Sequence, residues 1–214
     1  MKGHIVVHPH FVELRDRIRQ HLPDHSIPPP KWLYGAHGDP RSDVMFICEN
    51  PSELGVKGAD RRYGHTGIEA QWRNNVFRDV LVECGLKLGG RDTPGGWRCY
   101  ITNFIKQVDK ASVWAEKPQP EKLVIAERWL DILKWEISRV KPRTVFCVGK
   151  RVWGYVTFFQ RKGLLLVPNP HRIWHYSARR RDLVRGKMNE GIRKGLDAHI
   201  LGPETPSHTG KSRS

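Results

Sequence analysis

Short runs of apolar residues alternate along the chain with stretches in which apolar residues recur every three or four positions. Four of the runs have the length and composition of buried β-strands, at residues 44–47, 100–102, 144–148 and 164–167. Apolar strands that alternate with helices typically form a parallel sheet with both faces covered. The pattern therefore predicts an α/β fold, a three-layer α/β/α sandwich around a central, mainly parallel, four-stranded sheet.

The stretches between these runs have the spacing of amphipathic helices. Phe11, Leu14 and Ile18 share one face of the first stretch, which stops before Pro23. Gly85 follows the second stretch and Pro118 precedes the third, and these residue types typically end and begin helices. The predicted helices cover about 10–22, 76–84, one long helix from 118 through 137, 150–159 and 178–197.

The pattern indicates a single domain over residues 1–201. Residues 202–214 are polar and rich in Pro, Ser and Thr, so we expect a disordered tail there. No stretch approaches the roughly 20 apolar residues that span a bilayer, and the apolar start of the chain is too brief for a secretory signal. We therefore expect a soluble cytoplasmic protein, associated with the nucleoid and without a membrane partner.

The chain is strongly basic. Its 37 Lys and Arg residues against 22 Asp and Glu residues give a formal net charge of +15. This charge is typical of proteins that bind phosphate-rich partners, because each neutralised phosphate releases condensed counterions. Eight Trp residues suit base stacking, although most Trp residues simply pack. A basic protein with no nucleic-acid role is the alternative, since charge alone identifies no partner.

Polar residues gather just after the predicted strands. In a parallel sheet, ligands bind outside the carboxyl ends of the strands. The segments that follow the four predicted strands are 48–52, 103–106, 149–151 and 168–171. Three of these segments contain Asn, Glu or His, whose side chains can hydrogen-bond a polar ring. The topology thus predicts a polar pocket without saying what it does.

Several common catalytic motifs are absent. Gly149-Lys150 does not complete a P-loop, because Thr144 stands where that pattern needs Gly. No P-C-x-x-C segment supports a zinc base deaminase. His171 and His175 have a metal-binding spacing but no third ligand nearby. The four cysteines form no C-x-x-C pair, so we expect reduced, structural thiols.

Taken together, the strand-end segments resemble motifs of the uracil-DNA glycosylase superfamily, in order and spacing, over about residues 31–175. F-I-C-E-N-P-S at 46–52 is similar to its water-positioning loop, and combines the acidic position of iron–sulfur members with the Asn of mismatch-type members. Y-I-T-N-F-I-K at 100–106 is similar to the Y-I-T-N-V-V-K of iron–sulfur members. N-P-H at 169–171 occupies the place of an H-P-S or N-P-S motif before the DNA-wedging loop. Each motif is common alone, and the ordered set is much stronger.

The chain departs from the iron–sulfur members of the superfamily. Gln107 and Ala126 stand where those members place Cys, and their N-terminal Cys pair is missing. We therefore expect no iron–sulfur cluster, no other cofactor and no metal. The mixture of motifs matches no single branch, which leaves the substrate range open.

Hydrolysis of an N-glycosidic bond in DNA needs a flipped base, a stabilised leaving anion and a placed water. Glu49 and Asn50 are predicted to hold and polarise that water, and Glu49 to oppose positive charge on the sugar. A simple turn at Asn-Pro-Ser is the alternative. By resemblance, Asn169 donates a hydrogen bond to the uracil O2, and His171 is the chemically better but displaced donor. Asn169 could instead shape a turn, and His171 could contact phosphate.

The base itself needs a hydrogen-bonding partner and an aromatic surface. Asn103 is predicted to bind the base edge, because one amide offers both a donor and an acceptor; capping the strand end is the alternative. Tyr63 is expected to stack on the flipped base, with Trp72 as the second choice. Ordinary packing is the alternative for both aromatic side chains.

Two further sets of residues are expected to contact DNA. The residues expected to wedge into the base stack are Arg172, Ile173 and Trp174. The residues expected to contact phosphates are Lys106, Lys150, Arg151 and those at 179–181. For 179–181, a solvated helix start is the alternative.

The sequence therefore predicts a monomeric DNA-repair glycosylase that flips uracil, or a related deaminated base, out of DNA and hydrolyses its N-glycosidic bond. Two alternatives stay open. One is a nucleic-acid-binding module that kept the fold and lost catalysis. The other is a hydrolase of free nucleosides or nucleotides, which would need neither a wedge nor so large a positive charge.

Overall fold

The computed structural model describes residues 8–21, 36–50, 75–93, 95–107, 110–176 and 180–200. Three predictions fall outside these residues: base stacking by Tyr63 or Trp72, the disordered tail at 202–214, and phosphate contact by the first Arg of the 179–181 run.

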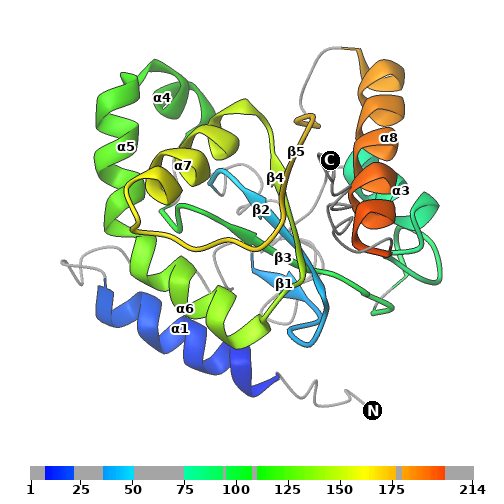
Figure 1. Cartoon of the computed structure of the whole chain (residues 1–214), viewed down its shortest axis with the longest axis horizontal. Helices are drawn as coiled ribbons and strands as arrows, with labels where there is room; N and C mark the ends of the chain where they lie inside the picture. Colours follow the sequence, from blue (N-terminus) through cyan, green and yellow to red (C-terminus); the bar gives the residue numbers. More distant parts are fainter. Residues whose placement is uncertain are drawn as a thin grey trace, which may run out of the picture.

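A five-stranded sheet lies at the centre of the described chain (Figure 1). Its strands are β1 (His37–Gly38), β2 (Val44–Cys48), β3 (Tyr100–Asn103), β4 (Thr144–Val148) and β5 (Pro170–Ile173). Their order across the sheet is β1-β3-β2-β4-β5. Strands β2 to β5 are parallel to one another, and β1 is antiparallel to β3. The predicted α/β fold with a mainly parallel sheet is confirmed.

Two details of the strand prediction are wrong. The two-residue strand β1 was not expected, so the sheet has five strands where four were predicted. Residues 164–167 form no strand, because Leu165 and Val167 pack into the core from an irregular segment that pairs with no neighbour. The strand begins later, at Pro170, a position that tolerates the missing N–H because it is the first of the strand.

Helices cover both faces of the sheet and complete the three predicted layers (Figure 1). One face carries α1 (Pro9–His21), α5 (Gln119–Arg128), α6 (Leu130–Val140) and α7 (Lys150–Arg161). The other face carries α3 (Asn75–Glu83) and α8 (Arg181–Ile200). The short helix α4 (Ala111–Glu116) precedes α5.

The core follows from the alternation of side chains along each strand. On β2, Met45 and Ile47 pack against α1, α5, α6 and α7, whereas Phe46 and Cys48 pack against α3 and α8. All five residues of β2 are buried, and so are all five of β4. Burying one such large apolar side chain stabilises the fold by roughly 1.5–3 kcal/mol. These continuous apolar runs explain why the two central strands were predictable.

The helices depart from the prediction mainly in one place. The expected long helix after Pro118 is two helices, because Trp129 leaves the helical conformation (φ −93°, ψ 0°) between α5 and α6. Helix α4 was not predicted, and α8 begins at Arg181 rather than at 178. Among the described residues, no helix has the length and apolar character needed to cross a membrane.

A buried ion pair fixes the chain where it leaves β3. The Nζ atom of Lys106 lies 2.5 Å from Oε2 of Glu136 on α6, and both side chains are fully buried. The hydroxyls of Tyr100 and Thr102 donate hydrogen bonds to Oε1 of Glu136, at 2.7 and 2.6 Å. Lys106 also donates to the Thr102 hydroxyl. The β3 strand and α6 are thereby joined by one hydrogen-bonded cluster.

The predicted phosphate contact by Lys106 is wrong. A side chain with no exposed surface cannot reach a DNA phosphate. Burial lowers the pKa of the Lys106 ammonium, and the Glu136 carboxylate opposes that shift. Because the pair is hydrogen-bonded as well as ionic, Lys106 is a structural cation inside the core.

We expect the two charges to depend on each other for stability. Glu136→Gln leaves a buried ammonium without its counter-charge and should lower the free energy of unfolding by about 3–5 kcal/mol. Lys106→Met should lower it in the same way, because it leaves the carboxylate unpaired. The double variant removes both charges, while the Gln oxygen still accepts hydrogen bonds from Tyr100 and Thr102. Its free energy of unfolding should therefore fall by less than the sum of the decreases in the two single variants. Urea denaturation of the four proteins measures this; strictly additive losses would contradict the interpretation.

Candidate active site

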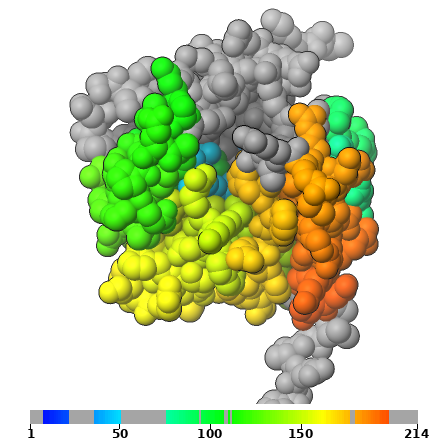
Figure 2. All heavy atoms as spheres, turned by 90° about the horizontal axis from the view of Figure 1, so that it is seen from above, coloured from blue at the N-terminus to red at the C-terminus, as the bar shows by residue number. Residues whose placement is uncertain are grey.

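Strands β2 to β5 end along one edge of the sheet, which we call the carboxyl edge. In Figure 1 this edge faces the top, where α8 begins. Figure 2 looks onto it and shows part of the 36–50 segment (blue) set back between α4 and α5 (green) and α7 (yellow-green). Ligands of parallel sheets bind at such edges.

Glu49, the first residue after β2, holds a carboxylate at the carboxyl edge. Its side chain is 8% exposed, and Nε of Arg151 lies 2.8 Å from Oε1 and 2.9 Å from Oε2. The Tyr155 hydroxyl donates to Oε1 at 3.1 Å. Burial and the nearby Glu49 raise the pKa of Tyr155, so the phenol remains a proton donor. Two side chains of α7 therefore fix the orientation of this carboxylate.

One oxygen of Glu49 retains capacity to bind water. A carboxylate oxygen can accept about two hydrogen bonds. Within the described residues, Oε2 accepts one hydrogen bond, from Arg151, and Oε1 accepts one from Tyr155 while also lying 2.8 Å from Nε of Arg151. The arrangement is consistent with a polarised water at Oε2, the role predicted for Glu49.

Backbone pairing brings Asn103 beside Glu49. Cys48 and Asn103 are register partners at the ends of β2 and β3, and the Ile105 amide donates to the Glu49 carbonyl at 3.0 Å. The Asn103 side chain is buried. Asn50 is partly exposed and makes no side-chain hydrogen bond within the described part of the chain. The structure therefore brings Glu49, Asn50 and Asn103 together, and their chemical roles stay predictions.

Asn169 lies at the opposite edge of the sheet, so its predicted place beside the base is wrong. It precedes β5, and its Nδ2 donates to the carbonyl of Arg143, which precedes β4, at 3.1 Å. Its backbone is left-handed, with φ 39°, a conformation that Asn tolerates better than most residues. The alternative role, shaping the turn before Pro170, is the one that the geometry supports.

His171 also lies away from the carboxyl edge. It pairs with Phe146 in the middle of the sheet, and the two rings are 5.5 Å apart. Above it, α8 approaches so closely that a Cβ on Gly195 would lie 3.2 Å from Cγ of His171. The predicted donor role of His171 is therefore wrong, because the strand that carries it lies six residues beyond the predicted one, at 170–173 rather than 164–167.

The residue that reaches the carboxyl edge from β5 is His175, which the sequence analysis considered only as a metal ligand. It follows β5 by two residues and stacks on Tyr176, with ring centroids 4.3 Å apart. Burial lowers the pKa of His175; the Glu49 carboxylate opposes this shift, and the Arg151 cation adds to it. His175 therefore lies within electrostatic reach of the Glu49–Arg151 pair.

Gly149 makes room for this histidine. It is the N-cap residue between the end of β4 and the start of α7, with φ 95°, a conformation that L side chains rarely adopt. A Cβ at this position would lie 3.1 Å from both Cβ and Cδ2 of His175. Only glycine therefore satisfies both the turn into α7 and the close approach of the imidazole.

The residues predicted to contact DNA separate into two groups. Ile173 is 2% exposed and belongs to the core under α8, so its predicted wedge role is wrong. Arg172 is exposed but lies within β5, opposite Cys147. Trp174, 47% exposed, is the first residue after β5 and lies at the carboxyl edge. Lys150 is exposed in the first turn of α7 at the same edge. Wedging by Trp174 and phosphate contact by Lys150 stay predictions.

The described residues contain no group of three or more His, Cys, Asp or Glu side chains that could hold a metal ion. The four cysteines are free thiols, and Cys48, Cys99 and Cys147 are buried. Burial raises the pKa of Cys147 to about 12, so this thiol is protonated near neutral pH.

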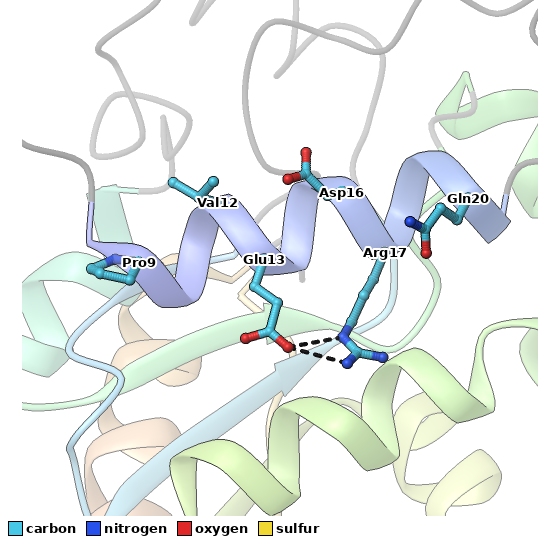
Figure 3. A pocket seen from close by; sticks show the side chains of 6 residues that line it. All are labelled: Pro9, Val12, Glu13, Asp16, Arg17 and Gln20. Carbon is cyan, nitrogen blue, oxygen red and sulfur yellow. Dashed lines mark hydrogen bonds and ion pairs between the residues drawn. The ribbon is translucent and has the colours of Figure 1, made fainter.

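A hollow of about 560 Å³ lies elsewhere, on the outer surface of α1 (Figure 3). Side chains of this one helix line it, including Glu13 and Arg17, which form an ion pair at 3.1 Å. It contains none of the residues of the carboxyl edge, and we assign it no part in the chemistry.

Comparison with protein families agrees with this geometry. Residues 36–193 match the family model of the uracil DNA glycosylase superfamily. The matched stretch spans all five strands and well over half of the chain, so the protein belongs to this superfamily. Membership supports a glycosylase-type function on a DNA substrate. No curated protein matches the chain.

The position of β5 offers a second candidate for the last motif. The superfamily resemblance places an H-P-S or N-P-S motif after the last core strand, and β5 ends at Ile173. His175-Tyr176-Ser177 stands there in this chain, rather than the N-P-H at 169–171. With the strand placed at 170–173, the H-x-S spacing of residues 175–177 is the sequence signal that would have pointed to His175.

The lowered pKa of His175 has a consequence for stability. Its imidazole binds a proton more readily in the unfolded chain than in the fold, so the unfolding free energy should fall as pH drops below about 6.5. His175→Gln should make this decline shallower. It should not abolish it, because burial also lowers the pKa of His10 and His171. Urea denaturation at pH 7.5, 6.5 and 5.5 measures both slopes, and equal slopes would show that His175 is solvated in the fold.

Proposed function

We propose that this protein is a monofunctional glycosylase that removes uracil, or another deaminated base, from DNA and leaves an abasic site. Superfamily membership supports the class of reaction. The observation that carries the proposal is the convergence of Glu49, Asn103 and His175, from the ends of three strands, on one edge of the sheet. A duplex shields the glycosidic bond, so the base must be flipped to reach this edge.

Glu49 supplies the water. A water bound to Oε2 attacks C1′ of the deoxyribose, and its proton passes to the Glu49 carboxylate. As the new C–O bond forms, the C1′–N bond breaks and its electron pair leaves with the base. While the bond breaks, the carboxylate also opposes the positive charge that develops on the sugar.

Asn103 and His175 act on the base. The Asn103 amide can donate to one group of the base edge and accept from another. Burial lowers the pKa of His175, which favours the neutral imidazole at pH 7. A neutral imidazole N–H is suited to donate a hydrogen bond to O2 as negative charge develops there.

The DNA duplex would lie across the carboxyl edge. Trp174 would fill the gap left by the flipped base, and its exposure after β5 supports this role. Lys150 and Arg181 are exposed in the first turns of α7 and α8, Arg180 is exposed directly before α8, and all three are suited to bind phosphates. We propose that the protein acts as a monomer and that Tyr63 or Trp72 stacks on the base.

One assay tests the function. The protein is incubated with single- and double-stranded oligonucleotides that contain one uracil, hypoxanthine or xanthine, and the products are treated with alkali. Strand breaks at the modified position support the proposal. Binding without strand breaks would favour a nucleic-acid-binding module that has lost catalysis. Activity on free nucleosides alone would favour a hydrolase of free nucleosides or nucleotides.

Substitution of the water-binding residues separates chemistry from binding. Glu49→Gln and Asn50→Ala should each lower the single-turnover rate by at least about tenfold, because a positioned general base typically contributes 10²–10⁴-fold. The affinity for DNA should change little. Glu127→Gln, the same change at an exposed site on α5, is the control and should retain the wild-type rate. Wild-type rates in both site variants would show that the water is held elsewhere.

A further inference from the structure

We infer that Arg151 is a positioning residue that couples DNA binding to the Glu49 carboxylate. This inference rests on the proposed function, since it assigns Glu49 to the water. It goes further in giving one cation two simultaneous partners, the carboxylate on one side and a DNA phosphate on the other.

The first observation is the geometry of the ion pair. Nε of Arg151 donates a hydrogen bond to Oε2 of Glu49 at 2.9 Å and lies 2.8 Å from Oε1. Within the described part of the chain, the two terminal nitrogens of the guanidinium make no hydrogen bond. These nitrogens carry four N–H groups, and a guanidinium binds phosphate through paired N–H groups.

The second observation is the contrast in exposure. The Arg151 side chain is 49% exposed, whereas that of Glu49 is 8% exposed. The cation therefore reaches from a nearly buried carboxylate to the surface. There it lies beside the exposed Lys150 in the first turn of α7. A phosphate drawn to this turn meets the open side of the guanidinium.

The third observation is that, among the described residues, both hydrogen-bond donors to the carboxylate lie on one helix. Arg151 and Tyr155 are one turn apart on α7 and both donate to Glu49. A phosphate that immobilises Arg151 therefore also immobilises the Glu49 carboxylate, and Oε2 with it. Small displacements of reacting groups have large effects on rate, and about 1 Å can cost about 100-fold.

The inference predicts that rate and affinity separate at Arg151. Arg151→Lys retains the positive charge but loses the planar group that can bridge two anions. It should lower the single-turnover rate at saturating uracil-containing DNA by about tenfold or more. Its Kd for that DNA should stay within about threefold of wild type, since Lys still binds phosphate as a point charge. Arg161→Lys, the same change at the other end of α7, is the control and should leave both quantities unchanged.

Two further variants complete the test. Tyr155→Phe removes the buried donor to Oε1 and should lower the rate with no change in Kd, because Tyr155 is buried. Arg151→Gln should lower the rate and weaken binding as well, and should reduce the slope of log K against log salt by about 1.

The outcomes are distinguishable. A wild-type single-turnover rate in Arg151→Lys would overturn the inference. It would also be overturned if Arg151→Lys lost rate and affinity in parallel while Tyr155→Phe kept the wild-type rate, because Arg151 would then be a simple phosphate contact. In both cases an active wild-type protein leaves the proposed function standing. A wild-type protein that releases no base would instead refute the proposed function and this inference together.

Discussion

The structure depends on a charge that the fold buries where β3 leaves the sheet. Lys106 and Glu136 form an ion pair with no exposed surface, and Tyr100 and Thr102 complete the hydrogen bonding of the carboxylate. The cluster extends to α1, because Nε2 of His10 lies 3.0 Å from the Tyr100 hydroxyl. A buried charge that loses its partner is strongly destabilising, so this cluster constrains three elements together. Asn103 lies between the residues that form it, which is why a feature of the core bears on the candidate site.

The carboxyl edge is built by a second constraint, the close packing of strand ends. Gly149 lets the imidazole of His175 approach the turn into α7, and that same turn begins the helix that carries Arg151 and Tyr155. Glu49, from β2, meets these two side chains, while Asn103 is fixed beside it by the pairing of β2 with β3. The geometry of the candidate site therefore depends on backbone spacing as much as on the identity of the polar residues.

The central strands were predictable because they are apolar throughout. β2 and β4 are buried on both faces, so their sequences form continuous apolar runs. β5 lies at the edge of the sheet, and its sequence, Pro-His-Arg-Ile, has little apolar signal. The apolar residues just before it, Leu165 and Val167, bury themselves from an irregular segment. The prediction took that segment for the strand, and this shift is why Asn169 and His171, rather than His175, were expected at the carboxyl edge.

The positions of Glu49 and Asn50 were predictable for a physical reason. Glu49 and Asn50 follow β2 directly, so any correct placement of that strand places them too. The partners of Glu49 could not be predicted in the same way. Arg151 and Tyr155 are separated from it by about a hundred residues, and only the packing of α7 on the sheet brings them together. The position of a charged residue along the chain can be read from the sequence, but its ion-pair partner depends on the tertiary packing.

The same distinction applies to the net charge of +15, which suggested a phosphate-rich partner. Several of the cations that make up this number are committed within the fold. Lys106 is paired inside the core, Lys87 is buried with its ammonium donating to the carbonyls of Leu88 and Thr93, and Arg185 is paired with Glu83.

The positive charge available to DNA is therefore smaller than the total, and its position on the surface matters more than its amount. Lys150 and Arg151 begin α7, and Arg181 begins α8, so the exposed cations at the carboxyl edge lie where a phosphate backbone could align a flipped nucleotide with Glu49. Positive charge placed at the edge that holds the carboxylate provides both attraction and orientation, whereas the same charge spread over the surface would provide attraction alone.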